Sequence, residues 1–377
     1  MAHLMDVKPD QMPEKLQTDT LWPLRSLQAI AVAWIVLNQF REHLGLALGA
    51  RHGLVAKGYL GAELFFVTAG FIAFHTWTRL REDGRLRQMS LLWRKLIRVW
   101  PLQVATLAAM GLLALAAARE GTPIDAQVFD PAAIPANLTL TQAWGVLPTV
   151  SWNFPSWLVS AEWFAAIVFP VTAVIVRAWR WPWMAAAAPV VLFACAFDLC
   201  QARHILFSDM TAQIGALQTV PAFLFGAGLC RFGQERGLSV TAARLMVPLS
   251  AAWIAAASIL RLADPFIFPA FGLLALGLAE RARQGRPLIA GPAWRYLGGL
   301  AYALMLVYLP VDIAFFHVWR LLFGAPHGAM AWLALAGVFP AILVAAIGAH
   351  HLVERPAYAW LRRLNPFPEP PAIQEPA

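Results

Sequence analysis

The chain has 377 residues, of which 60% are hydrophobic and only 13% are charged. Soluble domains are nearer half apolar and a quarter charged, so this composition excludes an ordinary soluble protein and indicates an all-α, polytopic membrane helix bundle. The net charge of +8 does not indicate nucleic acid as a partner, because the basic residues follow a membrane pattern. The three cysteines, Cys195, Cys200 and Cys230, form neither a disulfide framework nor a metal pattern, and no metal site is expected.

Residues 1–23 form a polar segment without the apolar stretch of a cleavable signal peptide, so we expect the first membrane helix to direct insertion. A span needs about 20 mostly apolar residues. About ten spans follow by this criterion within residues 24–355, at roughly 24–46, 58–78, 96–118, 156–176, 181–199, 211–230, 243–260, 264–280, 296–319 and 330–352. The connection 119–155 contains five prolines and is expected to be an ordered loop or a short re-entrant cover. Residues 356–377 form a Pro-rich tail.

The basic residues are unevenly divided between alternate connections. With the N-terminus inside, the cytoplasmic connections hold 22 of the 29 Lys and Arg residues, and the outer connections hold seven. This asymmetry is typical of a correct list of spans. It predicts both termini in the cytoplasm, 119–155 outside, and the lipid bilayer with its acidic headgroups as the nearest partner of the positive charge.

The first span carries the polar residues Arg25, Gln28, Asn38, Gln39 and His43, and four of them, all but Asn38, recur on one side. Gln28 and Gln39 are eleven residues apart, and Arg25 and His43 are eighteen apart. At about 100° per residue both spacings return to nearly the same direction, so the four side chains form one stripe. We expect the stripe to face the bundle interior, where it contacts substrate or supplies interhelical hydrogen bonds.

Two carboxylates in later spans are candidates for function, Glu63 within Gly58–Phe71 and Glu162 within Pro155–Phe164. Each is predicted to lie about 8–10 Å below the start of its helix on the outer side. Two carboxylates at similar depth can hold a proton, bind a sugar hydroxyl or pair with the polar stripe. A purely structural salt bridge is the alternative.

The third span begins with a basic cluster, Arg94, Lys95 and Arg98. Arg94 and Arg98 share a helix face because they are four residues apart. Guanidinium groups bind phosphates well, so the cluster predicts a site for a polyphosphate such as coenzyme A at the cytoplasmic end. The alternative is that the side chains extend to lipid headgroups.

Several of these segments resemble the membrane acyltransferase-3 family. Gly61–Phe71 is similar to its G-(V/A)-(D/E)-L-F-F-V-x-S-G-F signature, and Trp93–Pro101, Pro155–Pro170, Leu297–Pro310 and Val353–Arg363 are similar to four further blocks in the same order. The resemblance implies a ten-span O-acyltransferase of the bacterial inner membrane. Such a protein moves an acyl group, most simply acetyl, from cytoplasmic acyl-CoA to an extracytoplasmic glycan or glycolipid hydroxyl. Acyl-CoA is then a donor substrate rather than a permanently bound cofactor, and polysaccharide-synthesis proteins are the implied partners.

The chain departs from the family pattern at four positions. The family's first span carries an Arg and a His eleven positions apart, where this chain has Gln28 and Gln39. Tyr308 replaces a His in the late block, and Ala69 replaces a Ser. Glutamine cannot titrate, so Gln39 can orient a substrate but cannot accept the hydroxyl proton that acyl transfer releases.

The sequence therefore leaves His43, Glu162 and Glu63 as candidate bases, with Gln28 and Gln39 lining the transfer path. The same departures also fit a catalytically degenerate family member that acts as a binding or accessory protein. A lipid or solute transporter is a weaker alternative, because no pair of broken helices recurs in two halves of the chain.

Overall fold

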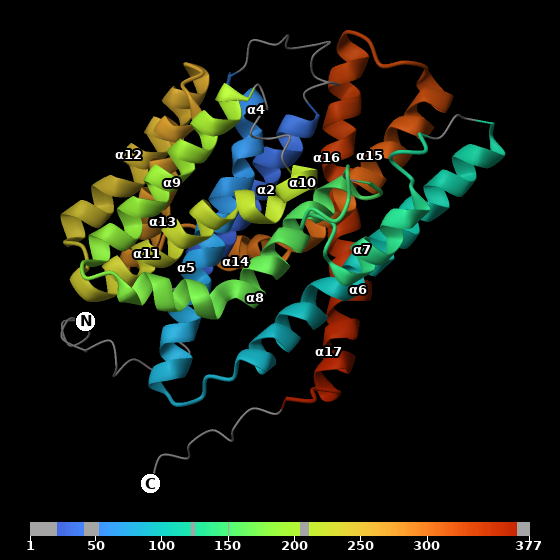
Figure 1. The fold of residues 1–377 in the computed structure, drawn as a ribbon. Coiled ribbons are helices and arrows are strands. Elements are labelled where there is room, and N and C mark those ends of the chain that lie inside the picture. Colours follow the sequence, from blue (N-terminus) through green and yellow to red (C-terminus); the bar gives the residue numbers. More distant parts are fainter. Residues whose placement is uncertain (1–20, 41–52, 122–124, 150, 204–210, 368–377) are drawn as a thin grey trace.

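The structure is a computed structural model that describes residues 21–40, 53–121, 125–149, 151–203 and 211–367. Within these ranges every regular element is a helix, and the helices pack into one bundle (Figure 1). The predicted all-α membrane bundle is confirmed. The polar residues 1–20 and the last residues of the Pro-rich tail lie outside the described ranges.

Eight helical stretches in the described part of the chain are long and apolar enough to cross a membrane. They are α4 (Gly53–Ala56) with η4 (Lys57–Leu60) and α5 (Gly61–Glu82); α6 (Gln88–Arg119); η6 (Phe154–Ser156) with α8 (Trp157–Ala178); α9 (Pro182–Ala202); α12 (Val240–Ile259); α13 (Asp264–Arg283); α15 (Ala301–Phe323); and α16 (Ala329–Ala349) with the π-helical turn η8 (His350–Glu354) and α17 (Arg355–Arg363). The first and sixth predicted spans fall on α2 (Trp22–Gln39) and on the pair α10 (Thr211–Gln218) and α11 (Val220–Arg236). These two are not among the eight, yet α2 and α11 both pack against α5 inside the bundle.

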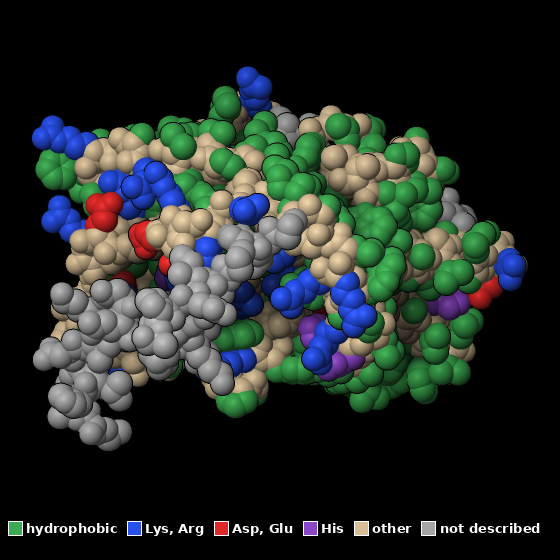
Figure 2. Space-filling model, turned by 90° about the horizontal axis from the view of Figure 1, so that it is seen from below, with side chains coloured by type: hydrophobic (Ala, Val, Ile, Leu, Met, Phe, Trp, Pro, Cys, Tyr) green, Lys and Arg blue, Asp and Glu red, His purple; other side chains and the backbone are tan. Residues whose placement is uncertain are grey.

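The connections alternate between two ends of the bundle, as the spans predict. One end, called here the basic end, carries the α5–α6 turn, the α8–α9 connection and α17, and it is the lower end in Figure 1. There Arg231 of α11 donates hydrogen bonds to the carbonyl oxygens of Val176 (2.6 Å) and Trp179 (2.8 Å). At the opposite end, Lys57 pairs with Asp264 at 2.5 Å. Viewed from below, Lys and Arg side chains gather on the basic end (Figure 2).

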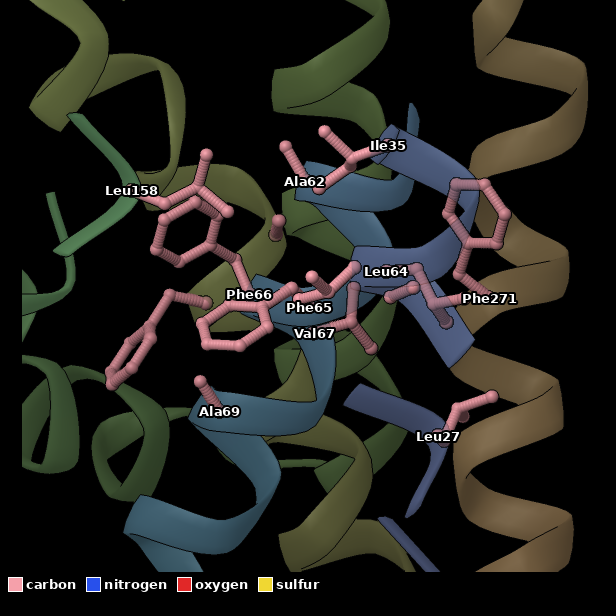
Figure 3. Packing of buried hydrophobic residues seen from close by; sticks show 14 of the residues in the cluster. Leu27, Ile35, Ala62, Leu64, Phe65, Phe66, Val67, Ala69, Leu158 and Phe271 are labelled. Carbon is pink, nitrogen blue, oxygen red and sulfur yellow. The ribbon is translucent and has the colours of Figure 1, made fainter. Parts of the chain in front are cut away.

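The centre of the bundle is α5, which contacts α2, α8, α11 and α13. Its side chains interdigitate with apolar side chains of these neighbours (Figure 3), among them Leu27 and Ile35 of α2, Leu158 of α8 and Phe271 of α13. Two glycines let α5 and α11 touch through their backbones. A Cβ on Gly226 would lie 1.8 Å from the Val67 carbonyl oxygen, and one on Gly70 would lie 2.0 Å from the Phe223 carbonyl oxygen. Small residues at such crossings are typical of membrane helix packing.

The connection between α6 and α8 folds back into the bundle. It forms η5 (Pro131–Ala133) and α7 (Ile134–Thr139). The Leu138 carbonyl accepts a hydrogen bond from Trp100 of α6 at 2.8 Å, and Asn153 donates to the Leu306 carbonyl of α15 at 2.9 Å. Trp100 lies in the interior of α6 and Leu306 in the second turn of α15, so the connection reaches past the ends of both helices, which agrees with the predicted re-entrant cover. Consequently α8 begins inside the bundle, where Trp157 is buried.

Candidate functional site

A cavity of about 820 Å³ lies at the basic end between α2, α5, α6, α8, α14 (Pro292–Gly299), α15 and the α16–α17 junction. Its charged lining consists of six basic and two acidic side chains: Arg25, Arg94, Lys95, Arg98, Arg295, Arg355, Glu162 and Glu354. The volume is within the range of small-molecule sites, about 300–1,000 Å³. An excess of cations in a partly desolvated cleft attracts polyanions strongly.

The three basic residues of α6 that the sequence singled out all line this cavity. Arg98 extends toward the α16–α17 junction, where its Nε lies 3.8 Å from Oε1 of Glu354. Its guanidinium carbon also lies 5.1 Å from the ring centroid of Tyr302. The cluster therefore points into the protein, and the prediction that it faces a site is supported over extension to lipid.

Glu162 faces the interior and is only 4% exposed. Lys95 Nζ lies 2.6 Å from its Oε1, and the Tyr302 hydroxyl donates to its Oε2 at 2.5 Å. Both carboxylate oxygens thus have a donor, which is the usual condition for a charge buried in a membrane bundle. Its partners come from α6 and α15, not from the polar stripe of α2.

Helix α14 places Arg295 at the cavity, close to Arg25 of α2. Ser26 of α2 is buried, and its hydroxyl is satisfied because it donates a hydrogen bond to the Trp294 carbonyl oxygen of α14 at 3.0 Å. This contact brings Arg295 next to α2. The guanidinium carbons of Arg25 and Arg295 lie 5.1 and 5.9 Å from the ring of Trp22, so one aromatic side chain orients two cations.

The junction of α16 and α17 is a π-helical turn, a local widening that is frequent at functional sites. Within it, His350 Nδ1 lies 2.8 Å from Glu354 Oε2. The next residue, His351, is not among the lining residues, and its Nε2 contacts the Tyr296 hydroxyl at 3.0 Å. The turn therefore presents a His–carboxylate pair to the cavity.

The two glutamines of α2 are not equivalent. Gln28 is buried and lines the cavity. Gln39 is the last residue of α2, is exposed, and lies outside the cavity. The prediction that the stripe faces the interior is therefore wrong at Gln39. Helical periodicity gave the direction of the side chain, but eleven residues correspond to about 16 Å along the axis, which carries Gln39 away from the cavity. His43 lies outside the described residues.

Glu63 is buried but does not line the cavity. It lies on the first turn of α5 toward the opposite end, and Gln218 Nε2 is 3.4 Å from its Oε1. Glu162 instead meets Lys95, two turns from the start of α6 at the basic end. The predicted similarity in depth is wrong because α8 begins inside the bundle rather than at its surface.

Sequence reasoning missed several cavity residues that the late segments supply. Tyr302, Glu354 and Arg355 fall within the two late blocks that resemble the acyltransferase-3 pattern, and those blocks were the available signal. His350 and Arg295 lie just outside the blocks. Nothing in their local sequence distinguishes them from ordinary polar residues at helix ends.

The fold and the cavity define a polytopic helical membrane protein with a basic cavity at one end of the bundle. A family model described as an acyltransferase domain, acyltransferase-3, matches residues 25–350. The chain therefore belongs to the membrane acyltransferase-3 family. No curated protein and no solved structure matches it.

Proposed function

We propose that the protein transfers an acyl group, most simply acetyl, from cytoplasmic acyl-CoA to a hydroxyl of a glycan or glycolipid destined for the outer side of a bacterial inner membrane. The observation that carries the proposal is the basic cavity in a member of an acyltransferase family. Six cations at one membrane end suit a donor with several phosphates.

The rest of the lining suits the other parts of the donor. Aromatic side chains of Trp22, Tyr296 and Tyr358 offer ring faces for an adenine near the arginines. Ile72, Phe169 and Phe223 form an apolar wall that suits the pantetheine arm and the acyl chain. The cavity thus has a charged part and an apolar part, as acyl-CoA has.

The orientation follows from the distribution of Lys and Arg. The basic end carries the connections that hold most of these residues, so the positive-inside rule assigns it to the cytoplasm. Acyl-CoA is made in the cytoplasm and would enter the cavity directly from that side.

A second function, binding without catalysis, is favoured by one observation. Gln28 lies buried in the cavity where the family carries an Arg, and its amide can neither titrate nor offer a charge. A protein that binds acyl-CoA and presents it to a partner could carry this replacement without losing its function.

Isothermal titration of the purified protein with CoA and with pantetheine tests the donor site. Pantetheine lacks the phosphates, and each charge-assisted hydrogen bond is worth about 1.5–3 kcal/mol. We expect CoA to bind at least about a hundredfold more tightly. Equal affinities, or no binding of CoA, would remove the basis of the proposal.

A further inference from the structure

The α16–α17 junction places a histidine where acyl transfer needs a base. His350 lines the cavity, and its side chain is 18% exposed. Its Nδ1 is 2.8 Å from Oε2 of Glu354, which is itself 4% exposed. Within the described part of the chain its Nε2 makes no hydrogen bond. We propose that His350 is the general base of the transfer and that Glu354 is its positioning residue, an inference that rests on the proposed function.

The geometry fixes which nitrogen acts. A carboxylate can only accept a hydrogen bond, so Glu354 selects the tautomer with the proton on Nδ1. The lone pair is then on Nε2, which is the arrangement of a His held by an acidic residue in hydrolytic triads. Glu354 also lies 3.8 Å from Arg98 Nε, so the base and the donor-binding cluster are held by the same carboxylate.

The other candidates are less suited to this role. Gln28 cannot titrate, although it lines the cavity. Glu162 already binds Lys95 and Tyr302 with both oxygens. Glu63 and Gln39 lie outside the cavity. Among the described groups that line the cavity, His350 is the only imidazole, and its Nε2 makes no hydrogen bond within the described part of the chain.

The step balances without a further reactant. His350 Nε2 takes the proton of the acceptor hydroxyl while the oxygen attacks the thioester carbonyl and a C–O bond forms. The tetrahedral adduct then expels the CoA sulfur as the C–S bond breaks. The imidazolium returns its proton to that sulfur, so the products are an ester and CoA-SH.

The location of His350 also restricts the class of acceptor molecule that can react. His350 lies about one helical turn deeper than Glu354, still within the half of the bundle at the basic end. The acceptor hydroxyl must therefore enter the same cavity as the donor. A glycolipid head group at the donor face of the membrane meets this requirement, and a polymer already outside the cell does not.

The pH dependence of transfer reports this base. Charged or titratable groups around this part of the cavity are Glu354 and His351 beside it, Arg355 and Tyr358 on α17, Arg94, Lys95 and Arg98 on α6, Arg25 on α2, Glu162 on α8, and Arg295, Tyr296 and Tyr302 on α14 and α15. A histidine base works only when neutral, so the rate should fall on the acid side of the profile. The other groups shift the pH at which the rate falls but do not cause the fall themselves.

The test uses the full-length protein in proteoliposomes, with labelled acetyl-CoA as donor and octyl glucoside as a glycolipid probe. His350→Gln should lower kcat by about a hundredfold or more and abolish the acid limb, with the KM for acetyl-CoA nearly unchanged. His317→Gln is the matched control, since His317 pairs with Glu120 at 3.1 Å at the opposite end. It should transfer like the wild type.

The outcomes separate the inference from the function on which it rests. If His350→Gln transfers acetyl at the wild-type rate, His350 is not the base, but the acyltransferase function stands. Equal loss in the two histidine variants, with equal loss of thermal stability, shows a structural effect and also overturns it. If the wild type binds CoA but neither transfers nor hydrolyses acetyl-CoA, both the base and the enzymatic function fail, and the binding function stands.

Discussion

Lys95 Nζ lies 2.6 Å from Glu162 Oε1, and this ion pair joins α6 to α8 inside the cavity. It ties together two segments that the sequence assigns to different ends of the membrane. The pair also means that Lys95 is already partly neutralised before any ligand arrives. The donor phosphates are therefore expected to rely on the arginines more than on Lys95.

Breaking this pair should destabilise the protein. Removal of one partner from a fully buried pair costs about 3–5 kcal/mol. Because the Lys95 side chain is 26% exposed, we expect a smaller loss of about 1–3 kcal/mol for Glu162→Gln. Thermal unfolding in detergent measures the effect. The double variant with Lys95→Met should recover part of the loss, whereas additive losses would show that the pair contributes no coupling.

The donor site should fail when its two α6 arginines are removed together. Arg94→Ala with Arg98→Ala is expected to weaken CoA binding about a hundredfold or more, since each charge-assisted contact is worth about 1.5–3 kcal/mol. Isothermal titration gives the affinity. Arg79→Ala with Arg81→Ala, on α5 at the same end but outside the cavity, is the control. An unchanged affinity in the first variant would return Arg94 and Arg98 to lipid headgroup contacts.

The crossing of α5 and α11 should tolerate no side chain. In Gly226→Ala the new Cβ would meet the Val67 carbonyl oxygen at 1.8 Å, so the two backbones must separate. We expect a loss of about 3 kcal/mol or more in unfolding free energy. Gly348→Ala, also within a helix but with open space around its Cβ, should leave the melting temperature nearly unchanged. Similar melting of both variants would mean that the helices do not cross this closely.

Restoring the family residues on α2 should have unequal effects. Gln28→Arg adds a cation one turn from Arg25 in the cavity, so CoA should bind about tenfold more tightly while the ligand-free protein loses stability. Gln39→His acts outside the cavity and should leave the transfer rate unchanged. A rise in transfer from Gln39→His alone would move the reacting centre to that end and contradict the role given to His350.

The assignment of the two ends to cytoplasm and exterior makes a separate prediction. Reporter fusions at Gly84 and Ala132, both exposed, should report the cytoplasm and the outer side respectively. The reason is the excess of Lys and Arg in the connections at the basic end. If both fusions report one compartment, the order of spans between them is wrong.

The sequence predicted the bundle well because a lipid environment demands long apolar helices, and these are visible without any tertiary information. The same environment demands that a carboxylate such as Glu162 face the interior. For Arg94 and Arg98 the sequence left extension to lipid headgroups open, and only the cavity favours the inward direction. The sequence could not predict how deep each of these side chains lies in the bundle. Whether Glu162 meets Glu63 or Lys95 depends on how η5, α7 and η6 fold into the bundle, which no periodicity reveals.

The cavity as a whole could not be predicted from the sequence either. Arg295, His350 and Glu354 follow the α6 cluster by about 200 residues or more, and only the packing of α14 and α17 against α2 and α6 brings them together. The π-helical turn that presents His350 has no sequence signature. A polar residue near a helix end is ordinarily a solvated one, so tertiary contacts had to decide.

Mass spectrometry of glycolipids and surface glycans tests the central claim most directly. The samples are the parent strain, a strain that lacks this protein, and that strain complemented with the wild type or with the Arg94→Ala, Arg98→Ala variant. The account predicts an acyl ester in the parent and in the wild-type complement that is missing from the deletion strain and strongly reduced with the variant. The same ester pattern in all four samples would contradict acyl transfer by this protein.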